Sequence, residues 1–296
     1  MHIFDSCPIC YCNKLSDFKE FGRTKLVKCR SCKIIFQNPQ PNTAEIKNFY
    51  DELYLQSISR NDVFLKYPQV KAAAEFHLQR IEQRFGKINS ILEIGCGNGE
   101  FLAALRDLGY SVDGIEISSD GCKYAKSHFD LNLFNGKIEQ FKTNKEFDLI
   151  IFNHSLEHFP DPKFAIQKSC ELLKKNGIVW IVLPNILSTD RFVHGDRWDG
   201  WHLPYHLFHF SPNSLKFLLK QAKFSRVELV KTFLNPVQIF KFFISGETDY
   251  ERKNINQVNT CCTACRNSEI NFIKRIIRKP ITFFFSGQNM TGFAVK

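Results

Sequence analysis

The stretch Glu93-Ile94-Gly95-Cys96-Gly97-Asn98-Gly99 decides the fold, because it follows a short apolar strand and begins a helix. Glycines at such a turn allow a tight bend and a close approach of the backbone to a ligand. A dinucleotide-binding loop has the spacing G-x-G-x-x-G, but the third glycine here comes one residue early and Glu100 takes its place. Acidic residues on both sides of the loop disfavour a pyrophosphate and favour a cationic ligand.

A second acidic residue, Glu116, ends the next apolar segment, 21 residues after Gly95. A carboxylate at this place in a nucleotide-binding fold can accept hydrogen bonds from both hydroxyls of a ribose. S-adenosylmethionine carries a ribose, a sulfonium and an ammonium group, so acidic residues beside the loop assist its binding. The loop therefore predicts an S-adenosylmethionine site rather than a glycine-rich turn without a ligand.

Strands and helices alternate along most of the chain. Strands are predicted at 91–94, 111–117, 131–134, 147–152, 177–183, 226–232 and 288–296, and helices at 99–108, 121–128, 162–173 and 213–222. This alternation predicts a doubly wound, mostly parallel α/β sheet. We divide the chain into a cysteine-rich unit (1–42), a helical linker or lid (43–87) in which Pro68 separates two helices, and a main domain (88–296) with a helical insertion at about 235–286.

Three further stretches identify a family. The segments from Leu156 to Pro162, from Gly177 to Asn185 and from Trp201 to Ser211, together with the glycine loop, resemble the class I S-adenosylmethionine-dependent methyltransferases over about residues 88–234. The last stretch resembles a bacterial subgroup linked to glycan and lipopolysaccharide gene clusters. The resemblance implies a seven-stranded Rossmann-like sheet and S-adenosylmethionine as the cofactor.

The resemblance also implies roles for individual residues. Glu93, Gly95 and Gly97, with Cys96 between the two glycines, would line the methionine part of the cofactor, Glu116 would bind the ribose, Ile117 would pack on the adenine and Asn153 would close the pocket. Many relatives have an aspartate after the third strand for the adenine amino group. This chain lacks that aspartate, so either backbone atoms or Glu139 take its role, or the contact is weaker.

Two C-x2-C pairs mark the beginning of the chain: Cys7 with Cys10, and Cys29 with Cys32. This spacing is typical of a zinc site with four thiolate ligands, and a unit of this size needs such a metal to fold well. Four protein ligands leave no open position, so we expect a structural zinc; a site without metal and a redox pair are the alternatives. The unit resembles the N-terminal zinc-binding segment of some bacterial sugar methyltransferases.

Histidines near the expected cofactor site are candidates for catalysis. His154 and His158 follow the fourth strand, at the sheet edge where such folds bind ligands, and His206 lies in a later loop. Transfer of a methyl group to a hydroxyl benefits from a general base, and His154 is our first candidate, with His158 and His206 as rivals. Alternatively, Glu157, His158 and His206 hold a divalent metal, as an E-x-x-E-H group does in some methyltransferases that act on RNA ends or quinone precursors.

Composition and charge indicate what kinds of partner the protein could bind. The formal net charge is +10, and residues 250–296 contain eight Lys and Arg against two acidic residues. Such a surplus suits an anionic partner or a solvated basic face. The aromatic and basic segments at 240–243 and 272–285 either rest on an anionic membrane or cap the pocket. The chain shows neither a signal peptide nor an apolar stretch near the ~20 residues that span a bilayer, so we expect a cytoplasmic protein.

These observations favour an S-adenosylmethionine-dependent methyltransferase that methylates oxygen on a sugar or another small-molecule acceptor in bacterial glycan or lipopolysaccharide synthesis. An RNA methyltransferase is less well supported, because the cysteine-rich unit has no aromatic run for stacking bases. A catalytically inactive binding protein of the same fold is a third possibility. Two features stay open: Trp198 and Trp201 either stack on a sugar or anchor their loop, and the group Cys261, Cys262 and Cys265 has no assigned role.

Overall fold

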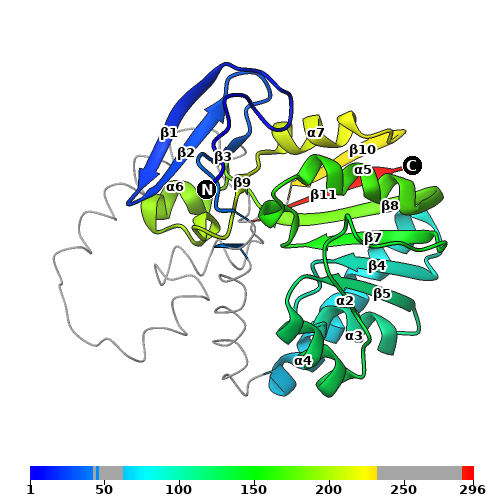
Figure 1. The fold of residues 1–296 in the computed structure, drawn as a ribbon. Helices are drawn as coiled ribbons and strands as arrows, with labels where there is room; N and C mark the ends of the chain where they lie inside the picture. Colours follow the sequence, from blue (N-terminus) through cyan, green and yellow to red (C-terminus); the bar gives the residue numbers. More distant parts are fainter. Residues whose placement is uncertain (43–44, 47–62, 232–288) are drawn as a thin grey trace, which may run out of the picture.

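A seven-stranded sheet forms the centre of the molecule in the computed structural model, which describes residues 1–42, 45–46, 63–231 and 289–296 (Figure 1). The strand order is β10-β11-β8-β7-β4-β5-β6. The strands are β4 (Ser90–Ile94), β5 (Ser111–Glu116), β6 (Phe134–Asn135), β7 (Phe147–Asn153), β8 (Leu173–Pro184), β10 (Arg226–Lys231) and β11 (Asn289–Val295). The first five are parallel, and β11 runs antiparallel to both neighbours. The predicted doubly wound α/β fold is confirmed.

Helices cover both faces of this sheet, because its central strands are apolar on both sides. Along β7, Leu149 and Ile151 pack toward α2 (Val63–Phe85) and α3 (Glu100–Asp107), whereas Ile150 and Phe152 pack toward α5 (Pro162–Leu172) and α7 (Pro212–Gln221). α4 (Ser119–Phe129) packs beside α3. Figure 1 shows the two groups of helices on opposite sides of the sheet. The carboxyl ends of the parallel strands therefore remain accessible at one edge.

Two predicted elements differ from those observed. α2 continues through Pro68, which was expected to separate two helices. A proline removes one backbone hydrogen bond, and burial of Ala74, Leu78 and Ile81 stabilises the rest of the helix. The third strand was expected at 131–134, but β6 begins only at Phe134 because Leu131 packs with α3 and α4 instead.

The N-terminal unit forms a second, four-stranded antiparallel sheet in the order β1-β2-β3-β9. Its strands are β1 (Leu15–Phe21), β2 (Thr24–Cys29), β3 (Ile35–Gln37) and β9 (Phe208–His209). β9 comes from the main part of the chain, so this sheet joins segments that lie far apart in the sequence. Figure 1 shows the hairpin of β1 and β2 above β9 and α6 (Thr189–His194). The boundary that we placed at residue 42 stays a prediction.

The four predicted zinc ligands come together in this unit. The sulfur atoms of Cys7, Cys10, Cys29 and Cys32 all lie within 4.8 Å of one another. Each C-x2-C turn is followed by a residue with positive φ, Tyr11 at 60° and Lys33 at 64°, so the two turns have the same form. Four convergent thiols in matched turns fit a tetrahedral zinc ion, so the unit is compatible with a zinc ribbon, and we call it the zinc ribbon.

Several expectations fall on residues outside the described ranges. These are the linker residues 47–62, the whole insertion at 235–286, the two aromatic and basic segments, and the group Cys261, Cys262 and Cys265. Within the described part of the chain, no helix is long and apolar enough to cross a membrane.

Candidate active site

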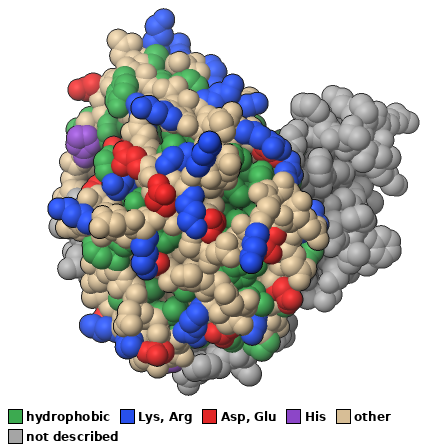
Figure 2. Space-filling model, turned by 90° about the vertical axis from the view of Figure 1, so that its right-hand side faces the viewer, with side chains coloured by type: hydrophobic (Ala, Val, Ile, Leu, Met, Phe, Trp, Pro, Cys, Tyr) green, Lys and Arg blue, Asp and Glu red, His purple; other side chains and the backbone are tan. Residues whose placement is uncertain are grey.

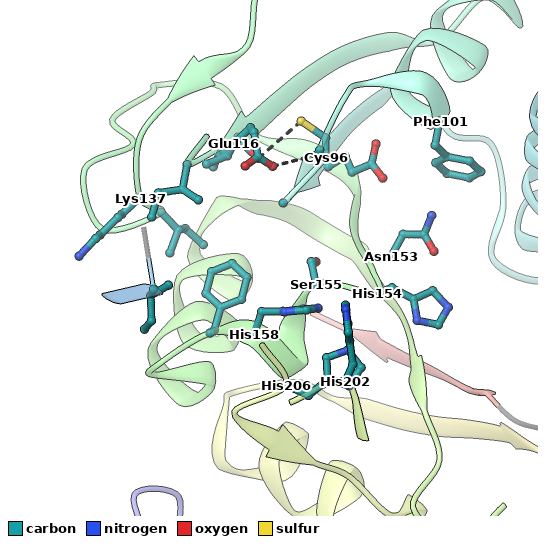
Figure 3. A pocket seen from close by; sticks show the side chains of 18 of the residues that line it. Cys96, Phe101, Glu116, Lys137, Asn153, His154, Ser155, His158, His202 and His206 are labelled. Atoms are coloured by element: carbon teal, nitrogen blue, oxygen red, sulfur yellow. Dashed lines mark hydrogen bonds between the residues drawn. The ribbon is translucent and has the colours of Figure 1, made fainter. Parts of the chain in front are cut away.

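A cavity of about 760 Å³ opens at the carboxyl edge of the parallel strands. All the residues predicted for the cofactor or as a general base line it: Glu93, Gly95, Cys96, Gly97, Glu116, Ile117, Asn153, His154, His158 and His206. Glu157, which was predicted as a metal ligand, lies behind its wall. Figure 3 shows Cys96 and Glu116 on one wall, with His158, His202 and His206 on the facing wall. The structure thus brings the predicted donor residues and the predicted catalytic residues into one space.

The glycine loop needs its glycines for two reasons. Gly95, Gly97 and Gly99 have φ values of 75°, 59° and 76°, which lie in the left-handed region that favours glycine. A Cβ atom on Gly95 would also lie 2.6 Å from the Cβ of Ser155, which is closer than carbon atoms approach. The loop therefore keeps its backbone tight against the turn that follows β7.

Two carboxylates stand beside this loop. Glu116 accepts hydrogen bonds from the backbone N–H groups of Gly97 and Ser118, each at 2.8 Å, and these bonds fix its orientation at the end of β5. Glu93 is only 2% exposed, and its Oε2 atom has no hydrogen-bond partner among the described residues. Burial and the nearby charge of Glu116 raise the pKa of Glu93 to about 8. An orphaned buried carboxyl group next to a second carboxylate fits a ligand that carries positive charge and hydrogen-bond donors.

The expected adenine region lies beyond β5 and β6. Ile117, Ile138 and Phe159 contribute apolar side chains to the cavity there, and Glu139 lines it as well. Asn135 donates hydrogen bonds from Nδ2 to the carbonyl oxygens of Glu116 and Ile117, each at 3.1 Å, and so ties β6 to the end of β5. A flat ring can enter between these side chains, and the contact of Glu139 with such a ring stays a prediction.

His154 differs from the other histidines of the cavity. Its backbone has a φ of 52°, and its ring lies between two partners: Nδ1 is 3.6 Å from Oε1 of Glu157, and Nε2 is 3.2 Å from the side-chain nitrogen of Asn289. The side chain of His154 is 42% exposed, whereas that of Glu157 is 1% exposed. A buried carboxylate beside Nδ1 favours the tautomer in which Nε2 can accept a proton.

Three other histidines form a cluster that extends to residues 202–206. The ring nitrogens of His158, His202 and His206 lie within 4.8 Å of one another. Nδ1 of His206 is 2.9 Å from the carbonyl oxygen of Gly200, to which it donates, so Nε2 faces the cluster as an acceptor. Burial lowers the pKa of His158 to about 3 and also lowers the pKa values of His202 and His206. These imidazoles are therefore neutral near pH 7.

Glu157 is the acidic residue behind this wall. Burial by itself would raise the pKa of Glu157, but the contact of its carboxylate with Nδ1 of His154 lowers it to about 2. Nε2 of His206 is 3.9 Å from Oε1 of Glu157. Glu157 is therefore an ionised carboxylate that lies between His154 and the cluster.

Sequence reasoning missed His202 as a member of the cluster and Ser155 as the residue that contacts the glycine loop. Ser155 donates a hydrogen bond to the carbonyl oxygen of Ile94 at 2.6 Å. His202 directly follows Trp201 in the histidine-rich stretch, which was the available signal. Trp198 and Trp201 are buried with Leu26, Ile35 and Ile186, an arrangement that favours the interpretation that they anchor their loop.

Comparisons with known proteins agree with this geometry. A family model described as a methyltransferase domain matches residues 66–229. The ubiquinone biosynthesis O-methyltransferase of Pelagibacter ubique (strain HTCC1062) is 32% identical over 130 residues, which cover 42% of this chain and 54% of that protein. The chain thus spans about half the length of the curated relatives that it matches.

Solved structures show the same fold. A SAM-dependent methyltransferase from Archaeoglobus fulgidus superposes with a TM-score of 0.50 at 22% identity, covering 78% of this chain and 94% of that one. The plantazolicin methyltransferase BpumL, solved with SAH and a pentazolic desmethylPZN analogue, gives a TM-score of 0.51 at 17% identity, with 86% of this chain and 99% of that one covered. Since the family model covers more than half of the chain, the chain belongs to the methyltransferase-domain family, and it has the fold of SAM-dependent methyltransferases of known structure.

Proposed function

We propose that this protein transfers the methyl group of S-adenosylmethionine to a hydroxyl oxygen of a small-molecule acceptor, with sugars of bacterial glycan synthesis as the first acceptors to examine. The observation that carries the proposal is the single cavity in which the acidic glycine loop faces a wall of histidines. Its volume of about 760 Å³ leaves room for a donor and a small acceptor together. The names of the relatives, ubiquinone biosynthesis O-methyltransferases, support oxygen as the acceptor atom.

On the donor wall, the two carboxylates have separate roles. Glu93 would accept hydrogen bonds from the ammonium group of the methionine part, because its Oε2 atom lacks another partner among the described residues. Glu116 would accept hydrogen bonds from the ribose hydroxyls, because each oxygen of a carboxylate can accept more than one hydrogen bond. The bound cofactor supplies an electrophilic methyl group, and alignment of the acceptor oxygen with it provides much of the catalysis.

On the acceptor wall, His154 is our proposed general base. Glu157 faces Nδ1 and favours the tautomer in which Nε2 is the proton acceptor. The acceptor hydroxyl would take the place of the side-chain nitrogen of Asn289 at Nε2, and Glu157 would then stabilise the imidazolium that forms. His158 is a weaker candidate because an imidazole with a pKa of about 3 is a poor proton acceptor near pH 7. His206 is buried and donates through Nδ1, so it is better suited to orient the acceptor than to remove its proton.

The structure changes the set of ligands for the divalent metal that we considered at the acceptor site. Three neutral imidazoles whose nitrogens converge within 4.8 Å are suitable ligands for a divalent transition metal, and the cluster contains His202 in place of the carboxylate that we expected, Glu157. If a metal binds here, it would polarise the acceptor hydroxyl. Removal of this metal with EDTA, under conditions that leave the zinc ribbon loaded, would then abolish activity; full activity after that treatment excludes the hypothesis.

The test of the proposed function is methyl transfer from labelled cofactor into nucleotide sugars, glycolipids, phenolic compounds and RNA. We expect label in a hydroxyl-bearing small molecule, and we expect the variant His154→Asn to lose transfer while its affinity for S-adenosylmethionine is retained. Labelling of RNA alone would reject the proposal in favour of RNA methylation. On the face shown in Figure 2, Lys and Arg side chains are interspersed with acidic ones, which gives that face no continuous basic patch for a nucleic acid.

A further inference from the structure

The zinc ribbon contacts the histidine wall directly. Strand β3 pairs with β9, with Ile35 opposite His209 and Phe36 opposite Phe208. The rings of Phe36 and Phe208 stack with centroids 6.0 Å apart. β9 begins two residues after His206, so the last strand of the ribbon lies alongside the loop that carries the acceptor histidines.

Gln37, the last residue of β3, holds this loop through three hydrogen bonds. Its side-chain Nε2 donates to the carbonyl oxygens of Pro204 and His206, both at 2.8 Å, and its backbone N–H donates to the carbonyl oxygen of Leu207 at 2.9 Å. The side chain is buried, with 2% exposure. Two carbonyl groups of the loop therefore depend on one amide of the ribbon.

The same loop is bonded to the turn that follows β7. The N–H of Leu207 donates to the carbonyl oxygen of Glu157 at 2.9 Å. Leu207 thus lies between the ribbon on one side and the residue that faces His154 and His206 on the other. Movement of β3 would shift the backbone of His206 relative to Glu157.

The position of β3 depends in turn on the metal site. Cys29 ends β2 and Cys32 lies three residues before β3 begins. The turn between them is closed by the N–H of Cys29, which donates to the carbonyl oxygen of Ile34, and by the N–H of Lys33, which donates to Cys29. Four thiols that are not bridged by a metal do not hold such a turn as firmly, because zinc supplies much of the folding free energy of small ribbons.

Aromatic contacts give a second connection to the loop. Trp201 packs against Phe21 of the ribbon hairpin at a centroid distance of 5.1 Å, and its indole N–H donates to the carbonyl oxygen of Gly195. His202 follows Trp201 directly. The donor wall, by contrast, is built on the loops that follow β4 and β5, on the other side of the cavity.

We propose that Gln37 is a positioning residue for the acceptor site, through which the zinc ribbon holds the 202–207 loop and its histidines in place. Zinc in the ribbon then controls the acceptor half of the cavity and leaves binding of the methyl donor unchanged. The inference rests on the proposed function only in calling this half the acceptor half; the hydrogen bonds that carry it are independent of the chemistry.

The variant Gln37→Leu tests the proposal, with Gln40→Leu as a matched control. Leucine keeps the volume of the side chain but removes both donors. Gln40 is a buried glutamine of the same segment, and its Nε2 atom has no hydrogen-bond partner among the described residues. Both variants are prepared as the full chain with zinc bound, and the zinc content is measured with a colorimetric chelator after mercurial release.

The main measurement is amide hydrogen exchange of the peptide that spans residues 200–209, which needs no methyl acceptor. We expect exchange at Tyr205, His206 and Leu207 to become at least about tenfold faster in Gln37→Leu, as for the loss of one or two buried hydrogen bonds, with zinc content and affinity for S-adenosylmethionine unchanged. Gln40→Leu should leave the loop as in the wild type. Unchanged exchange in Gln37→Leu, or an equal loss of donor affinity, overturns the proposal.

Removal of zinc from the wild-type chain gives a second measurement that decides the matter even if Gln37→Leu does not fold. We expect removal of zinc with a chelator, which leaves the thiol of Cys96 unmodified, to accelerate exchange in residues 200–209 and to change the tryptophan fluorescence, while calorimetry still shows binding of S-adenosylmethionine. Rapid loss of donor binding together with zinc would contradict the inference. Failure of the wild type to bind or transfer a methyl group would instead reject the proposed function, so the two failures are distinguishable.

Discussion

Replacement of Glu93 by glutamine should make the ligand-free protein more stable and its binding of S-adenosylmethionine weaker. The buried carboxyl group has its pKa raised from 4.5 to about 8 by burial and by Glu116. A raised pKa means that the folded state favours the protonated form. The contribution of this carboxyl group to the stability of the folded state is complete below pH 4.5 and is lost as the pH rises through 8. At 1.36 kcal/mol per pKa unit, the loss amounts to at most about 5 kcal/mol.

The same carboxyl group should make cofactor binding depend on pH. At pH 7 most Glu93 side chains are protonated, so a cationic ligand that requires the carboxylate displaces a proton. The association constant should therefore rise about 20-fold between pH 6.0 and pH 7.5 in the wild type, as follows from a pKa of about 8. Glu93→Gln should bind more weakly and lack this part of the pH dependence.

Titration calorimetry in two buffers of different ionisation enthalpy measures both the affinity and the number of protons released. Glu100→Gln is the matched control, because Glu100 lines the same cavity but is partly exposed. It should keep most of the wild-type pH dependence. Equal slopes for the wild type and Glu93→Gln, or no proton release by the wild type at pH 7, would refute the assignment of Glu93 to the cationic part of the cofactor.

Three further changes have expected outcomes. Gly95→Ala should lower both the melting temperature and the cofactor affinity, because its Cβ would lie 2.6 Å from that of Ser155. The control Gly109→Ala also has a positive φ but nothing within 4 Å, so it should lower the free energy of unfolding by only about 1–2 kcal/mol through backbone strain. Equal losses of unfolding free energy for the two variants in denaturant titrations would exclude the clash. His154→Asn should lower kcat by about 10²- to 10⁴-fold without changing the dissociation constant of S-adenosylmethionine, and a kcat near that of the wild type would exclude His154 as the base. Cys7→Ser should reduce zinc content and lower the melting temperature, whereas normal zinc content would show that Cys7 is not a ligand.

The parts of the site that the sequence predicted well are those with a local signal. The glycine loop and Glu116 lie within 24 residues of each other, and the strand-loop-helix pattern around them determines where they meet. The C-x2-C pairs likewise have a spacing that follows from tetrahedral coordination. In both cases the chemistry of the ligand restricts the sequence over a short distance, so the pattern can be recognised without the fold.

The parts that the sequence did not predict depend on contacts between distant segments. β9 contains only two residues, and its pairing with β3 joins positions about 170 residues apart; neither segment indicates the other. His202 enters the cluster for a similar reason, because its ring nitrogen meets that of His158 on a different segment of the chain. The continuation of α2 through Pro68 reflects burial of the helix against the sheet, which outweighs the local preference of proline.

The two walls of the cavity differ in the number of chain segments that build them. The glycines and the two carboxylates of the donor wall all belong to one continuous βαβ segment, against which the turn after β7 packs through Ser155. The acceptor wall needs three segments: the turn that carries His154 and Glu157, the loop that carries His206, and the strand that carries Gln37. Leu207 connects these three segments, because its N–H donates to the carbonyl oxygen of Glu157 and its carbonyl oxygen accepts from the backbone N–H of Gln37. The histidines can therefore lose their arrangement while the cofactor still binds, and the acceptor side is where changes in the zinc ribbon should affect the reaction.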